Sequence, residues 1–220
     1  MLATLLFQKP DRIPIVPGEG RRSTLERWHR EGLPVEVEDV TAFAYQSCGG
    51  KELLPAGGEG FPVDFKMIPR FEEKVMTRLE RTQIVQDWKG NVCEIGSEYS
   101  PEYLREPIDF VTRRWIKCPV ESREDWRNMM GRYDPDEQTR FPEDTEGASR
   151  RLKNRDWFVA LKGIPGPFWQ LREWLGFENL CMMFHDDPSF VAEMIAFWDD
   201  FIFRLLENVL GFWNGDCQRS

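Results

Sequence analysis

Four residues in the C-terminal third of the chain have the types and spacing of a substrate-binding site: Lys162, Trp169, Arg172 and Trp174. Lys162 ends a short apolar run, Trp157–Leu161, which predicts a buried strand. A Gly/Pro turn, Gly163–Pro167, then leads into a helical segment that carries the other three candidates. A turn of this kind exposes backbone N–H groups at a helix N-terminus, where anions bind, and Lys162 would add a cation for a carboxylate. No residue is assigned a catalytic role.

The same residues are also consistent with ordinary packing. Aromatic side chains at helical spacing commonly form core, and a lysine at a strand end extends its stem along apolar surface to reach water. The functional interpretation depends on the position of these residues after a strand, because active sites lie at the C-terminal ends of strands in parallel α/β folds. Both interpretations stay open at this point.

The usual catalytic and metal-binding motifs are absent from the sequence. It contains no G-x-G-x-x-G, P-loop, G-x-S-x-G or H-E-x-x-H motif. Cys181 and His185 share an i, i+4 spacing, but no further ligand stands near them in a zinc-binding pattern. No metal site is therefore expected, and His29 and His185 are interpreted as helix-surface residues.

Composition narrows the class of protein. The 220 residues carry a net charge of −9, which disfavours a nucleic-acid partner because phosphate binding needs a basic surface. Nine Trp and 16 Phe predict an aromatic-rich core or pocket. No apolar run approaches the ~20 residues of a membrane-spanning helix. The odd number of scattered cysteines indicates reduced thiols, and we expect a cytoplasmic protein: Cys48, Cys93, Cys118, Cys181 and Cys217.

Local signals predict the main elements. Ser23 and Glu26 have the spacing of a capping box before a helix that ends near Gly32. The turn Trp88–Asn91 predicts a β-hairpin within residues 74–95. Further elements follow from caps and periodicity: a strand at 110–118, a helix capped by Ser122, a short helix from Asp144 or Thr145 to about Asn154, and a long helix at 188–211 beginning at Pro188.

Three blocks together resemble the uroporphyrinogen decarboxylase superfamily. The first is P-D-R-I-P-I at Pro10–Ile15, with the T-L-E-R-W-H-R-E-G-L-P helix at Thr24–Pro34. The second is G-I-P-G-P-F-W-Q-L-R-E-W-L-G at 163–176, and the third is F-H-D-D-P-S-F-V-A-E-M-I-A-F at Phe184–Phe197. The resemblance implies a TIM (β/α)8 barrel. It also implies a lyase that decarboxylates a carboxylated tetrapyrrole.

The sequence departs from the decarboxylase pattern at three places. Gly18–Ser23 stands where the family has an R-Q-A-G-R segment, and Tyr45–Gly50 holds no counterpart of its F-S-D segment. Trp174 stands where the family has a tyrosine. Two alternatives therefore stay open beside the decarboxylase. One is a corrinoid- or cobalamin-dependent methyltransferase whose zinc-binding half is missing, and the other is a non-catalytic, degenerate barrel fragment.

The chain is too short for eight βα units, so we expect the N-terminal half of a barrel with an inserted β-hairpin. The single partial domain, 1–220, would comprise an N-terminal extension at 1–70, a hairpin and strand at 71–120, and βα units at 121–220. A truncated member of this kind is expected to be inactive alone. A homo-oligomer or the missing C-terminal half would cover its open edges. The expected partner is a small molecule, a tetrapyrrole or corrinoid. No cofactor is expected in this chain, whereas a full-length methyltransferase-type parent would use zinc and a corrinoid.

Overall fold

The computed structural model describes residues 2–10, 21–50, 58–60, 62–105, 112–153, 158–160 and 163–214. The chain divides into two compact units. The first unit comprises residues 1–59, 106–111 and 156–160, and the second comprises residues 60–105, 112–155 and 161–220.

Short elements make up the described part of the first unit. Its helices are α1 (Leu2–Leu5), α2 (Arg22–Arg30) and α3 (Val40–Ser47), and strand β1 (Gly58–Gly60), at the unit boundary, pairs with β6 (Phe158–Ala160). The predicted helix is confirmed as α2, and Gly32, with φ of +113°, follows its end. The predicted capping box is wrong, because the N-cap residue of α2 is Arg21, which makes no side-chain cap.

A four-stranded antiparallel sheet is the β component of the second unit. Its order is β2 (Lys74–Arg78), β3 (Thr82–Gln86), β4 (Val92–Gly96) and β5 (Arg114–Lys117). Strands β3 and β4 form the predicted hairpin, with Gln86 opposite Val92 across the turn. Strand β5 confirms the predicted 110–118 strand over Arg114–Lys117.

The expected TIM barrel of the uroporphyrinogen decarboxylase type is wrong, and so is its expected N-terminal half. The described residues show no repeating β/α unit, and their larger sheet is antiparallel. Only three residues separate β2 from β3, and five separate β3 from β4. Parallel strands need a crossover of a dozen or more residues, so these short connections permit only antiparallel pairing.

Helices form the rest of the second unit. They are the 3-10 turns η1 (Pro101–Arg105) and η2 (Gln138–Arg140), and the helices α4 (Arg123–Met130), α5 (Thr145–Lys153), α6 (Pro167–Leu175), α7 (Phe177–Asp186) and α8 (Pro188–Asn214). Two predicted caps are confirmed: the Ser122 hydroxyl accepts from the Asp125 N–H, and Asp187 accepts from the Phe190 N–H. Asp144, in turn, accepts from the Gly147 N–H at the start of α5.

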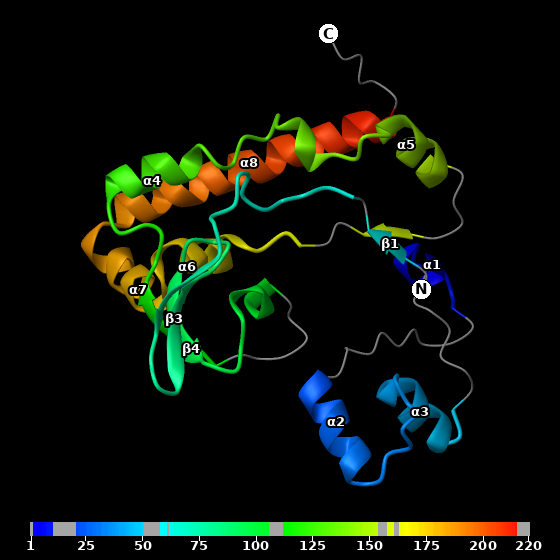
Figure 1. Cartoon of the computed structure of the whole chain (residues 1–220). Coiled ribbons are helices and arrows are strands. Elements are labelled where there is room, and N and C mark those ends of the chain that lie inside the picture. The colour runs from blue at the N-terminus through cyan, green and yellow to red at the C-terminus, as the bar shows by residue number, and fades with distance from the viewer. Residues whose placement is uncertain are drawn as a thin grey trace. The chain divides into compact units, whose positions relative to one another are not determined.

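Helix α8 is the longest element and supplies much of the core. It packs against α5, α6 and α7, with α4 beside its N-terminal part (Figure 1). The predicted apolar stripe is confirmed by its buried members: Val191, Met194, Trp198, Phe201, Leu205 and Val209. Although α8 has 27 residues, neither it nor any other helix in the described ranges is both long and apolar enough to cross a membrane.

A buried arginine joins the irregular segments of this unit. The Arg140 side chain is 1% exposed and donates to the backbone carbonyls of four residues: Asp64, Lys66, Arg132 and Asp134. Its guanidinium also lies 4.9 Å from the centre of the Phe201 ring on α8. Burial away from water lowers the pKa of this guanidinium from its usual range. Arg140 thus connects residues 64–66, residues 132–134 and α8.

Replacing Arg140 by lysine should destabilise the second unit. A single ammonium group cannot make four hydrogen bonds in these directions, so buried carbonyls would lose their donors. We expect the free energy of unfolding to fall by about 3 kcal/mol, the cost of one or two such bonds to a charged group. Urea unfolding followed by tryptophan fluorescence measures this. The same change at exposed Arg127 on α4 is the control, and an Arg140→Lys protein as stable as the Arg127→Lys protein would contradict the assignment.

Candidate ligand-binding site

The second unit contains a recess of about 380 Å³ with mostly apolar walls, which we call the aromatic pocket. It is lined by residues 65–67, 88, 89, 133 and 163–165 and by four residues of α6: Trp169, Gln170, Glu173 and Trp174. Its volume lies within the range of small-molecule sites, which is about 300–1,000 Å³. All of these residues belong to one compact unit.

Helix α6 places one face on the pocket. Positions 169 and 173, and positions 170 and 174, lie four residues apart, and 170 and 173 lie three apart, so their side chains share a side of the helix. Pro167 occupies the first turn, where its missing N–H costs nothing, and Gly176, with φ of +81°, ends the helix. Trp174 is fully buried, whereas Trp169 is 56% exposed. The helix therefore supplies both the floor of the pocket and its mouth.

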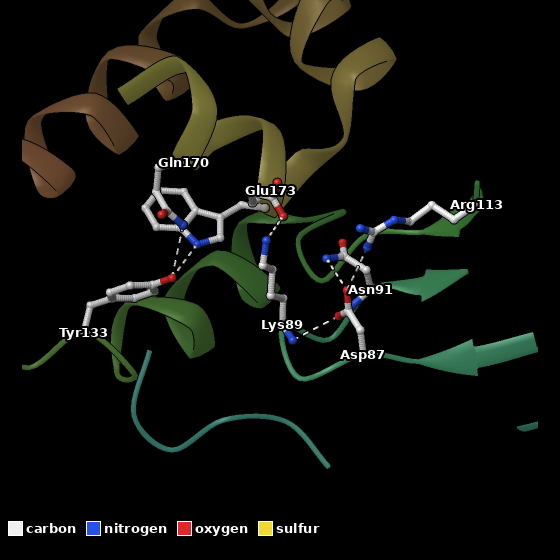
Figure 2. A network of polar contacts seen from close by, with 8 residues as sticks. Asp87, Lys89, Asn91, Arg113, Tyr133, Gln170 and Glu173 are labelled. Carbon is white, nitrogen blue, oxygen red and sulfur yellow. Dashed lines mark hydrogen bonds and ion pairs between the residues drawn. The ribbon is translucent and has the colours of Figure 1, made fainter. Parts of the chain in front are cut away.

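Tyr133 provides a polar group at the floor. Its ring is 4% exposed and packs edge-on against Trp174, Trp198 and Phe201. Its hydroxyl oxygen accepts from Gln170 Nε2 at 3.1 Å and from Trp174 Nε1 at 3.2 Å; Figure 2 shows the approach to Gln170. Burial raises the pKa of Tyr133 to about 12, so the phenol stays neutral near pH 7.

An ion pair stands at the pocket wall. Lys89 Nζ lies 2.5 Å from Glu173 Oε2, and both side chains are largely buried (Figure 2). Lys89 belongs to the β3–β4 turn, where the Asp87 carboxylate accepts from the backbone N–H groups of Lys89 and Asn91. Burial raises the pKa of Asp87, although these hydrogen bonds oppose the rise. The turn thus holds Lys89 and its neighbour Trp88 against α6.

The structure describes three of the four predicted residues, Trp169, Arg172 and Trp174, and all three lie on α6. Trp169 and Trp174 line the aromatic pocket, and Lys162 lies outside the described residues. Arg172 stacks on Trp169 at 4.2 Å but lines a different recess of about 700 Å³ with residues of β5. Two of the four candidates therefore line the aromatic pocket, and Arg172 contacts one of them without lining the pocket.

The sequence analysis missed the pocket residues that come from segments distant from α6 in the sequence. Phe65, Trp88 and Tyr133 reach the pocket from three separate segments. The Trp88–Asn91 turn was a visible signal, but it indicated only a hairpin. Nothing in the spacing of Phe65 or Tyr133 indicates their approach to α6, because tertiary contacts bring them there.

Metal ligands and reactive thiols are not features of this pocket. Among the residues that the structure describes, no group of three or more His, Cys, Asp or Glu side chains could hold a metal ion. The two buried thiols among the described residues, Cys93 and Cys118, do not line the pocket. Burial raises the pKa of Cys93 to about 12 and of Cys118 to about 11.

Comparisons of the chain with family models, with curated proteins and with solved structures give no match.

Tyr133 should make stability depend on pH in alkaline solution. Its pKa is about 12 when folded against about 10 when unfolded, so the unfolded state loses its proton first as pH rises. The stabilising contribution is complete below pH 10 and is lost as pH rises to 12. Between pH 8 and pH 11 the wild type should lose about 1.4 kcal/mol relative to a Tyr133→Phe protein. Urea unfolding at both pH values measures this, and a difference that stays constant would contradict the prediction.

The thiols should differ sharply in reactivity. Cys48 and Cys181 are exposed, whereas Cys93 and Cys118 are buried and their pKa values are raised. Because the thiolate is the reacting form, iodoacetamide at pH 8 should modify the buried pair at least about 100-fold more slowly. Peptide mapping by mass spectrometry measures the rates, and denaturant is the control that should equalise them. Equal modification of Cys93 and Cys48 in the folded protein would refute the assignment.

Proposed function

We propose that the second unit is a binding domain for a small, planar, largely apolar molecule, which occupies the aromatic pocket. The observation that carries the proposal is the convergence of Trp88, Trp169 and Trp174 on one recess from two separate segments. Aromatic faces in a recess of this size suit a flat ligand, because stacking adds to the benefit of removing apolar surface from water.

The exposure of Trp169 supports this proposal. Its neighbour Trp174 is fully buried, but Trp169 leaves 56% of its surface in water at the pocket mouth. A ligand in the recess would cover part of that indole and gain about 25 cal/mol for each square ångström of apolar surface removed from water. Core packing explains the burial of Trp174, but it does not explain why Trp169 is exposed to solvent.

The activities implied by the sequence resemblance are separate proposals, and the structure of the pocket is not their basis. Tetrapyrrole decarboxylation and corrinoid-dependent methyl transfer rest on the three short sequence blocks alone. A tetrapyrrole and a corrinoid therefore enter the test below as competing probes.

We also propose a cytoplasmic location. It rests on the scattered cysteines, of which the four described are free thiols.

Trp169→Ala should weaken binding of a planar two-ring probe. We use 2-naphthoate, measured by isothermal titration calorimetry on the full chain. Loss of one stacking face is worth about 1.4 kcal/mol, which corresponds to about tenfold in Kd. Phe168→Ala is the matched control, because Phe168 precedes Trp169 on α6 and is also exposed but does not line the pocket.

Three results would decide the proposal. Binding that Trp169→Ala weakens and Phe168→Ala leaves unchanged supports it. Equal losses in both variants, or no binding of 2-naphthoate, would contradict it. Tighter binding of uroporphyrin or cobalamin than of 2-naphthoate, with no effect of Trp169→Ala, would favour the activities implied by the resemblance instead.

A further inference from the structure

Among the described hydrogen-bonding groups at the floor of the aromatic pocket, one donor has no acceptor, and we call it the surplus donor. The Trp174 indole can only donate, and the Gln170 amide donates to the same oxygen. These two bonds occupy both lone pairs of the Tyr133 hydroxyl, so its own O–H must find a further acceptor. No hydrogen bond from this O–H is made to any other residue in the described ranges.

The surplus donor does not depend on how the Gln170 amide is turned. If the amide oxygen faced Tyr133, the hydroxyl would donate to it and the amide N–H groups would become the surplus. In either arrangement the pair Tyr133–Gln170 presents a donor. Both residues line the pocket and are buried. A buried donor without an acceptor is unfavourable, so an acceptor on the ligand would complete the site.

The mouth of the pocket carries an excess of positive charge. Lys89 is neutralised by Glu173. Lys66 is exposed, lies 5.3 Å from the centre of the Trp88 ring, and forms no ion pair within the described part of the chain. The pocket lining thus has two lysines and one carboxylate. An anionic group on a ligand would meet Lys66 at the entrance.

We propose that the ligand of the aromatic pocket is a planar aromatic carboxylic acid that also carries a carbonyl oxygen. The carbonyl accepts from the Tyr133–Gln170 pair at the floor, and the carboxylate lies beside Lys66 at the mouth. The inference rests on the proposed function and deepens it by naming the chemical class of the ligand.

Two matched probes test the carbonyl. Chromone-2-carboxylate and 2-naphthoate are both planar two-ring acids, but only the first carries a ring carbonyl. Calorimetry on the wild type should give a Kd for chromone-2-carboxylate about three- to tenfold lower, as expected for one added hydrogen bond. Equal Kd values for the two probes would overturn the inference while leaving the proposed function standing. Failure of both probes to bind would overturn the proposed function and this inference with it.

Gln170→Glu tests the donor. A carboxylate at this position accepts from the Tyr133 hydroxyl and donates nothing, so the surplus donor disappears in either amide arrangement. The ratio of the Kd values of 2-naphthoate and chromone-2-carboxylate should then fall to about one. The added negative charge weakens binding of both acids and so leaves this ratio unaffected. A preference that survives would overturn the assignment of the donor. If this variant does not fold, the wild-type ratio of the two probes still decides the inference.

Lys66→Met tests the charge at the mouth. It should weaken both acids by the same factor, about threefold for an exposed ion pair, and should keep their ratio. Lys153→Met, at an exposed position on α5 outside the pocket, is the matched control. Equal Kd values in the wild type and in Lys66→Met would overturn the placement of the carboxylate.

Discussion

The buried guanidinium of Arg140 is the interaction on which the second unit depends. Its charge is held by four backbone carbonyls rather than by a directly bonded carboxylate, so those carbonyls must converge on one point. Residues 62–71 have no regular secondary structure, and the bonds to Asp64 and Lys66 supply the constraint that a sheet ladder supplies elsewhere. The bonds to Arg132 and Asp134 hold the backbone on both sides of Tyr133. One side chain thus positions two walls of the aromatic pocket.

The pocket and the core share residues, so the two interpretations of the α6 aromatics were not exclusive. Trp174 packs against Trp126, Tyr133 and Trp198 in the core, and its indole N–H also fixes the Tyr133 hydroxyl at the pocket floor. Trp198 of α8 donates in turn to the carbonyl of Pro165, which also lines the pocket. Core packing therefore holds the floor of the pocket in place, so a ligand would find that part of the site already formed.

Local signals predicted the parts of the fold that local interactions determine. The Trp88–Asn91 turn, the caps at Ser122 and Asp187, and the stripe of α8 all follow from contacts within a few residues. The barrel was wrong because short motifs carried the resemblance, and motifs of strand-then-helix form do not specify which strands pair. Arg140 could not be found in this way either, since two of its acceptors lie 74 and 76 residues away. The α6 side of the pocket was predictable because its residues are neighbours in the sequence. The other walls were not, because distant segments supply them.

The chemistry of the described pocket residues suits recognition better than proton transfer. A general base works best when its pKa lies near the working pH. Burial raises the pKa of Tyr133 to about 12, so the phenol keeps its proton. The Glu173 carboxylate is held at 2.5 Å by Lys89, and withdrawing it for proton transfer would leave a largely buried ammonium without its partner. A neutral phenol with two donors on its oxygen becomes a stronger donor itself, because hydrogen bonds in a chain polarise one another. The burial that raises the pKa of Tyr133 therefore supports the proposed role of its hydroxyl as a hydrogen-bond donor to the ligand.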